Sequence, residues 1–209
     1  MPKLNANLTM MFTEVDFLQR FGRAAEAGFE AVEFLLPYEH EQARIADELG
    51  RHGLELVLHN LPSGNFEQGE RGVAALPERV GEFQAGVGQG IEYAKALGCT
   101  RLNCLAGIRP PAVPDETMLA TLVDNLRFAA QALEKEGIRL LVEPLNSQDV
   151  PGFYLTRSRQ ALEIFSMVEH PNLWLQYDIY HMQIMEGNLT RSIRDHLPSI
   201  GHMQLADNP

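Results

Sequence analysis

Cysteine and positive charge are both scarce in this chain of 209 residues. Cys99 and Cys104 are too far apart for a C-x-x-C redox pair. With no secretory signal ahead of Asn5, we expect both to be free buried thiols of a cytoplasmic protein. The formal net charge of −11 argues against a broad basic face for nucleic acid. No apolar run approaches the roughly 18 residues that cross a bilayer, so we expect neither nucleic acid nor a membrane as a partner.

Nucleotide-binding motifs are missing as well. No G-x-G-x-x-G follows the first predicted strand and the chain has no P-loop, which argues against an open, doubly wound sheet. The hydrophobic content of 45% and the charged content of 22% are ordinary for a globular protein. The length suits a single domain over residues 1–209.

What the chain does contain is a repeating unit: an amphipathic stretch, a glycine, and a short apolar strand that ends on a polar residue. Strands are predicted at residues 5–10, 31–35, 54–59, 100–105, 138–142, 173–178 and 202–205, and helices at 14–27, 39–52, 77–97, 119–133, 157–168 and 189–197. This alternation predicts a parallel sheet with right-handed crossovers. We therefore predict an α/β fold, a (β/α)8 TIM barrel whose last helix, strand and helix lie beyond Pro209.

The stretch 138–146 marks a candidate site. Residues 138–142 are typical of a strand buried on both faces, and Glu143 follows directly, before Pro144, which cannot donate a ladder hydrogen bond. Burying an unpaired carboxylate is costly or shifts its pKa, so Glu143 needs a partner. That partner is either a neighbouring lysine or arginine, or a bound cation.

Polar residues also lie at or near the ends of most of the other predicted strands, and in a TIM barrel these C-terminal ends form the active site. They are His59, Asn103, Glu143, Asp178 and Gln204, with Glu33 or Glu39 near the second strand. Each alone fits an ordinary structural role. Together, their carboxylate and amide oxygens suit a divalent metal, Mg²⁺ or Mn²⁺, whereas zinc would more often recruit histidine and cysteine.

Three segments carry a resemblance to a known family. Residues 142–146 (V-E-P-L-N), 176–183 (Q-Y-D-I-Y-H-M-Q) and 201–209 (G-H-M-Q-L-A-D-N-P) resemble the hydroxypyruvate isomerase family of xylose-isomerase-like TIM barrels. The resemblance spans the whole chain, and the last two segments are the specific ones. It implies isomerisation of hydroxypyruvate to 2-hydroxy-3-oxopropanoate (tartronate semialdehyde), or of a four-carbon oxo acid.

The resemblance also implies roles for individual residues. Glu143 falls on one of two glutamates that pass a proton between adjacent carbons. Glu143, Asp178 and Gln204 fall on positions that hold the divalent metal. The second catalytic glutamate of the family lies on the eighth strand, which we expect beyond Pro209.

Four residues are candidate contacts for a small carboxylate-bearing hydroxy-carbonyl substrate. His181, three residues after Asp178, is placed to hydrogen-bond a substrate oxygen or the metal's outer ligands, or else caps the loop. His59 either polarises the substrate carbonyl or is a structural histidine. Asn103 is a candidate because it lies at the same ends of the strands. Arg71, between glycines in the long loop 60–76, either clamps the substrate carboxylate or is a solvated loop residue.

Rival functions use the same residues. A 2-oxo-tetronate isomerase or a ketose 3-epimerase would share the architecture. A metal-dependent nuclease of the AP endonuclease type is disfavoured by the acidic balance and by the few strand-end histidines. A degenerate, non-catalytic barrel has the lack of an eighth strand as its only support. A homo-oligomer is compatible with the sequence.

Overall fold

The computed structural model describes residues 3–207. Its strands form one parallel sheet in chain order: β1 (Ala6–Asn7), β2 (Ala31–Glu33), β3 (Glu55–Asn60), β4 (Arg101–Cys104), β5 (Arg139–Val142), β6 (Leu173–Asp178) and β7 (Ile200–Gln204). The α-helices are α1 (Phe17–Glu26), α2 (Gln42–His52), α3 (Val80–Leu97), α4 (Asp115–Lys135), α5 (Ser158–Val168), α6 (Ile179–Met185) and α7 (Leu189–His196). Short 3-10 segments cover Phe66–Gln68, Pro77–Arg79 and Leu197–Ser199.

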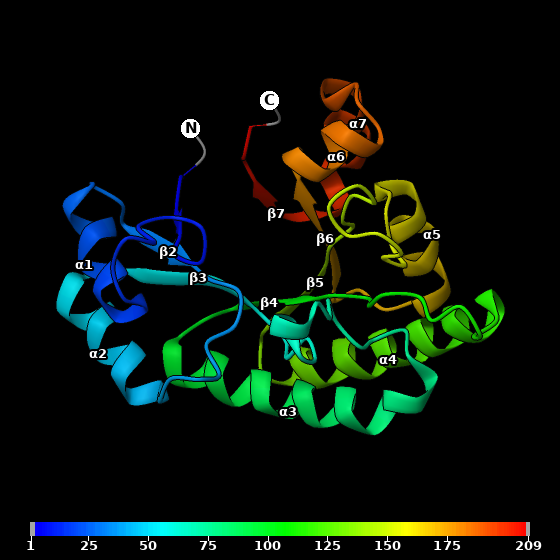
Figure 1. The fold of residues 1–209 in the computed structure, drawn as a ribbon, viewed down its shortest axis with the longest axis horizontal. Helices are drawn as coiled ribbons and strands as arrows, with labels where there is room; N and C mark the ends of the chain where they lie inside the picture. Colours follow the sequence, from blue (N-terminus) through cyan, green and yellow to red (C-terminus); the bar gives the residue numbers. More distant parts are fainter. Residues whose placement is uncertain (1–2, 208–209) are drawn as a thin grey trace.

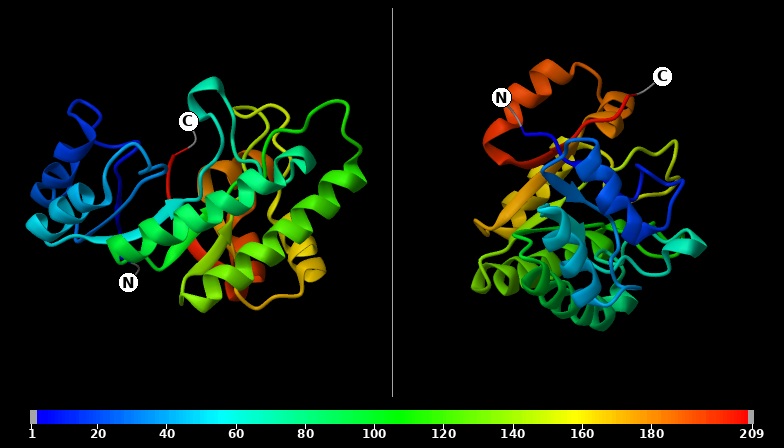
Figure 2. Two further views of the ribbon diagram at one scale, coloured as in Figure 1. Left: turned by 90° about the horizontal axis from the view of Figure 1, so that it is seen from below. Right: turned by 90° about the vertical axis from the view of Figure 1, so that its left-hand side faces the viewer.

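The sheet curls, and the helices cover its outer side (Figures 1 and 2). β1 and β7 face each other across the open side of the curl, and all neighbouring strands pair in parallel. This is the arrangement of a TIM barrel through its seventh strand, so the predicted fold class is confirmed. None of the described helices combines the length and the apolar character needed to pass through a bilayer.

Most element bounds differ from the prediction by a few residues, and two differences are larger. β1 stops at Asn7, because the amides of Met10 and Met11 both donate to the Asn7 carbonyl (3.1 and 2.8 Å) and turn the chain. α6 was not predicted. It begins directly at the end of β6, where the Asp178 carboxylate accepts a hydrogen bond from the Tyr180 amide (2.8 Å) and so caps the helix.

Alternate residues of each strand face opposite sides of the sheet. In β4, Leu102 faces the helices: a Cβ added to Gly90 of α3 would lie 3.3 Å from its Cδ1 atom. α4 buries Leu122, Leu126 and Leu133 at helical spacing in the same core. Full burial of one such side chain contributes roughly 1.5–3 kcal/mol. The helix-facing side of the sheet therefore carries the hydrophobic core.

Gly72 fixes the long loop between β3 and α3. Its φ of 96° is a left-handed value, and it forms a bridge with Ala106, beyond β4. A Cβ at this position would overlap the Leu105 carbonyl. Only glycine satisfies both constraints, so the loop that carries Arg71 is held against the end of β4.

Candidate active site at the strand ends

Polar side chains gather inside the curl, at the C-terminal ends of the strands. Hydrogen bonds join Asn7, Glu33, Gln204 and Gln176 from β1, β2, β7 and β6, and a second group joins Asn60, Asn103 and Glu143 from β3, β4 and the end of β5. β2 and β7 are not neighbours in the sheet, so these contacts cross the interior of the curl.

Glu143 is a buried carboxylate of the site, with an exposed fraction of 5%. The Asn103 Nδ2 atom donates to its Oε2 atom (2.7 Å) and also to Asn60 Oδ1 (3.1 Å). None of the ion pairs among residues 3–207 includes Glu143, so the lysine or arginine partner considered above is not found there. Burial, and then the negative charge of Asp178, raise the pKa of Glu143 to about 8.

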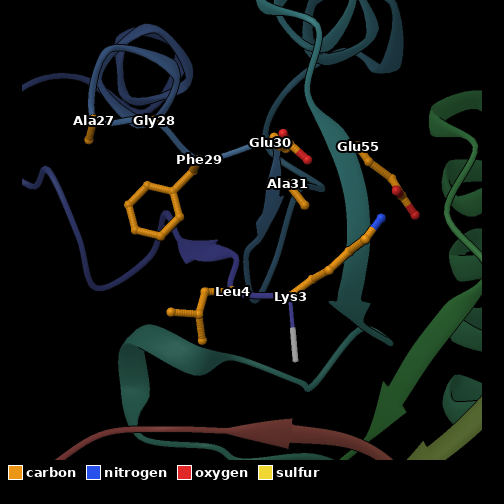
Figure 3. A pocket seen from close by; sticks show the side chains of 8 residues that line it. All are labelled: Lys3, Leu4, Ala27, Gly28, Phe29, Glu30, Ala31 and Glu55. Carbon is orange, nitrogen blue, oxygen red and sulfur yellow. The ribbon is translucent and has the colours of Figure 1, made fainter. Parts of the chain in front are cut away.

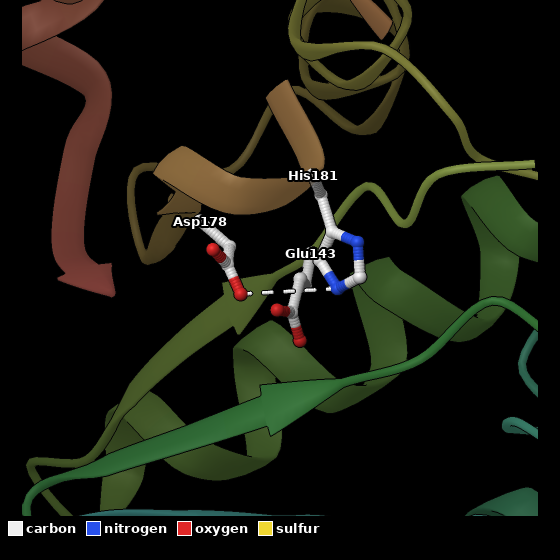
Figure 4. A group of neighbouring side chains, drawn as sticks. All are labelled: Glu143, Asp178 and His181. Carbon is white, nitrogen blue, oxygen red and sulfur yellow. Dashed lines mark ion pairs between the residues drawn. The ribbon is translucent and has the colours of Figure 1, made fainter. Parts of the chain in front are cut away.

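Asp178 and His181 stand next to Glu143 (Figure 4). One ligand atom from each of these three side chains lies within 4.8 Å of the other two. The His181 Nε2 atom is 3.8 Å from Asp178 Oδ2. Burial raises the pKa of Asp178, although the nearby His181 opposes the shift, and burial lowers the pKa of His181.

Gln204 lies at the end of β7, between two side chains. Its Nε2 atom donates to Glu33 Oε1 (2.7 Å), and its Oε1 atom accepts from Gln176 Nε2 (3.0 Å). The His202 Nε2 atom lies 2.7 Å from the other Glu33 oxygen. Although burial raises the pKa of Glu33, its hydrogen bonds and the charge of His202 lower that pKa overall. Glu33 was only one of two residues considered for the second strand, and the structure makes it a centre of this network.

The donor set fits a hard divalent cation. Glu143 is buried and Asp178 is partly buried, and within residues 3–207 neither carboxylate forms an ion pair with a lysine or arginine, so such a pair needs another source of positive charge. Two buried amide oxygens nearby in the network, Asn103 Oδ1 and Gln176 Oε1, have no hydrogen-bond partner among the described residues. Carboxylate and amide oxygens are the ligands that Mg²⁺ and Mn²⁺ prefer.

The structure does not bring His59 to this group. His59 is paired with Leu102 and Asn60 with Asn103, so Asn60 shares the inner side with Asn103 and His59 faces the helices. Its ring stacks on Phe34 (centroids 6.3 Å apart), and burial lowers its pKa to about 4. This environment is the one expected if His59 is a structural histidine and does not polarise the substrate carbonyl.

Arg71 is partly engaged within its own loop. Its Nη1 atom donates to the carbonyls of Phe66 (2.9 Å) and Glu70 (2.7 Å), and its guanidinium lies 3.8 Å from the centre of the Phe66 ring. No hydrogen bond within residues 3–207 uses its Nε or Nη2 atom. That edge of the guanidinium is the one that a substrate carboxylate could use.

A separate pocket of about 390 Å³ lies at the opposite end of the strands (Figure 3). It is lined by Phe29, Glu30 and Glu55, among others, near the starts of β2 and β3. It contains none of the polar residues gathered at the C-terminal ends, so it is not part of the candidate site.

Comparisons with known proteins identify relatives of this chain. Residues 21–209 match the family described as "Xylose isomerase-like TIM barrel". The chain is 50% identical to the hydroxypyruvate isomerase of Escherichia coli (strain K12) over 209 residues, which are 100% of this chain and 81% of that protein. It is 41% identical to a 2-oxo-tetronate isomerase of Pectobacterium atrosepticum over 100% of this chain and 80% of that protein.

A crystal structure described as AP endonuclease, family 2, from Brucella melitensis superposes with a TM-score of 0.97 at 43% identity, covering 100% of this chain and 81% of that one. The family match and the identity to the two isomerases both extend over nearly all of the sequence. The chain therefore belongs to the xylose isomerase-like TIM-barrel family, as an isomerase-type enzyme of the hydroxypyruvate isomerase group.

Proposed function

We propose that this enzyme interconverts hydroxypyruvate and 2-hydroxy-3-oxopropanoate. The observation that carries the proposal is the buried carboxylate of Glu143, which lies next to Asp178 and has no lysine or arginine partner within residues 3–207, in a chain 50% identical to a hydroxypyruvate isomerase. Isomerisation removes a proton from the hydroxymethyl carbon and returns one to the neighbouring carbonyl carbon. The negative charge that develops in between is shared by two oxygens.

Glu143 is the proposed proton carrier. Burial and the charge of Asp178 hold the pKa of Glu143 at about 8 when no cation is bound, and a cation held beside it would lower that pKa toward the ionised form that accepts a proton. Asn103 donates a hydrogen bond to the Oε2 atom of Glu143 and so helps to fix the orientation of the carboxylate. Burial keeps water away from this transfer.

Glu143, Asp178 and Gln204 would hold a divalent cation, Mg²⁺ or Mn²⁺. When bound, such an ion supplies positive charge where the two substrate oxygens become negative. Gln204 can take part through its Oε1 atom, because the Nε2 end of the same amide is already tied to Glu33. His181 and Asn103 would contact substrate oxygens, and Arg71 would bind the substrate carboxylate through its free edge.

The test is deuterium exchange from solvent into hydroxypyruvate, followed by NMR in buffer containing Mg²⁺ or Mn²⁺. The enzyme is expected to exchange the hydroxymethyl protons, and Glu143→Gln should abolish the exchange. Glu92→Gln, an exposed change on α3, is the matched control and should leave it intact. Exchange that survives in Glu143→Gln would remove Glu143 from the mechanism.

Two other functions have specific support. The 41% identity to a 2-oxo-tetronate isomerase favours a four-carbon substrate, and comparing kcat/KM on three- and four-carbon acids distinguishes the two. The Brucella melitensis structure is described as an AP endonuclease, family 2. Cleavage of abasic DNA, with affinity that falls steeply as salt rises, would support that activity. The net charge of −11 and a single group of three candidate ligands within residues 3–207 weigh against it.

A further inference from the structure

Asn146 is a buried asparagine in the loop after Glu143, and its amide has a defined orientation. Its Oδ1 atom accepts hydrogen bonds from the backbone amides of Gln148 (3.0 Å) and Asp149 (2.8 Å). Backbone amides can only donate, so the oxygen must lie on that side and the Nδ2 atom on the other. Nδ2 then donates to Asp149 Oδ2 and contacts His181 Nδ1, both at 2.8 Å.

His181 Nδ1 therefore meets two donors. One is Asn146 Nδ2, and the other is the Asn146 backbone amide at 3.3 Å. A ring nitrogen that faces only donors must offer its lone pair. A neutral imidazole carries a single N–H, so the proton of His181 is on Nε2. Figure 4 shows this Nε2 atom on the side of Asp178 and Glu143, 3.8 Å from Asp178 Oδ2.

We propose that Asn146 is a positioning residue that holds His181 in the Nε2–H tautomer, so that His181 donates a hydrogen bond into the site instead of ligating a cation. Ligation through Nε2 would need the lone pair that this tautomer lacks. Of the three side chains grouped at the strand ends, the two carboxylates thus remain as cation ligands, and His181 faces a substrate oxygen. The tautomer does not depend on the proposed function, whereas the substrate contact rests on it.

A second contact anchors the arrangement and offers a control. The Tyr180 hydroxyl donates to Asp149 Oδ2 (2.7 Å), the same oxygen that accepts from Asn146 Nδ2. Tyr180→Phe removes this outer hydrogen bond and leaves both Asn146 donors facing His181. Asn146→Asp replaces the Nδ2 donor by an acceptor of nearly equal size. Tyr180→Phe therefore tests the effect of loosening the loop, whereas Asn146→Asp tests the effect of the group that contacts the His181 ring.

The experiment is a long-range ¹H–¹⁵N correlation spectrum of the histidine rings in the ¹⁵N-labelled chain, at mildly alkaline pH. His181→Gln assigns the His181 signals. The spectrum is recorded in a chelator and again with Mg²⁺ alone as the added ion. We expect a protonated Nε2 and an unprotonated Nδ1, unchanged by Mg²⁺ and by Tyr180→Phe. In Asn146→Asp the ratio of the two tautomers should invert.

Three results would overturn the proposal: a wild-type His181 protonated on Nδ1, loss of the Nε2 proton when Mg²⁺ binds, or an unchanged tautomer ratio in Asn146→Asp. If Asn146→Asp does not fold, the wild-type spectra with and without Mg²⁺ still decide the tautomer. Absence of exchange into hydroxypyruvate with the tautomer intact would count against the proposed function and leave the assignment of Asn146 standing.

Discussion

Replacing Glu143 by glutamine should stabilise the chain at alkaline pH when no divalent cation is bound. The folded protein favours the protonated form of Glu143, because its pKa rises from 4.5 to about 8 on burial and next to Asp178. The contribution of Glu143 to the stability of the folded state is therefore fully present below pH 4.5 and is lost as the pH rises to about 8. Above that pH the wild type must fold around a buried negative charge, whereas glutamine stays neutral.

The size of the effect follows from the two pKa values. Each tenfold change in proton affinity is worth about 1.4 kcal/mol, so the difference between 4.5 and about 8 corresponds to about 5 kcal/mol. The stability difference between Glu143→Gln and wild type should grow by about 1.4 kcal/mol per pH unit across this range and then level off. Glutamine also keeps an acceptor for the Asn103 amide, so little of the change should come from lost hydrogen bonding.

The measurement is urea unfolding of both proteins in a chelator at several pH values. Every other titrating group is common to the two chains, so the difference isolates Glu143 and its coupling to Asp178. Added Mg²⁺ should restore the wild type at alkaline pH, because a cation that binds only the folded state stabilises it. The same addition should help Glu143→Gln far less. A stability difference independent of pH would refute the reasoning, because Glu143 would then not be a buried group with a raised pKa.

Further changes test the surrounding structure. Asp178→Asn removes the like charge, so the pKa of Glu143 should fall, and in the same titration the loss of stability should level off at a lower pH and be smaller in total. Glu33→Gln should lower the free energy of unfolding at neutral pH by about 1–3 kcal/mol, because Glu33 accepts four hydrogen bonds. The pKa of Glu33 is lowered by folding, so this penalty should shrink as the pH falls below 4.5. Gly72→Ala should destabilise by about 2 kcal/mol or more in thermal unfolding, because of its φ of 96° and the overlap described above. Arg71→Ala should raise KM for carboxylate substrates far more than for a neutral ketose, and equal effects would count against the clamp.

The order of strands and helices was predictable because most strand–helix boundaries carry their own local signal. β6 begins and ends where the apolar run 173–178 predicted it. α6 escaped prediction for a local reason: a single residue, Asp178, both ends β6 and caps the helix. No glycine or loop separates the two elements, so nothing in the sequence marks a second start.

The site was predictable only as far as strand ends could be located to the residue. Glu143 and Asp178 were located correctly and lie together in the structure. The end of β3 shows the limit, because the prediction stopped at His59 and the strand runs to Asn60. A shift of one residue exchanges the inner and the outer side of a strand. The contact of Glu33 with Gln204 joins β2 and β7 across the interior, and no local pattern reports such a contact.

The alternation in β4 has a consequence for how this protein can change. Leu102 and Asn103 are neighbours in the chain, yet one anchors the strand to α3 and the other holds Glu143. In β4, adjacent residues therefore serve stability on one side of the sheet and the candidate site on the other. Substitutions of inner-facing residues can change which substrate is bound, while the outer-facing residues continue to stabilise the fold. Proteins that descend from one ancestral barrel can therefore differ in substrate and still share the same hydrophobic core.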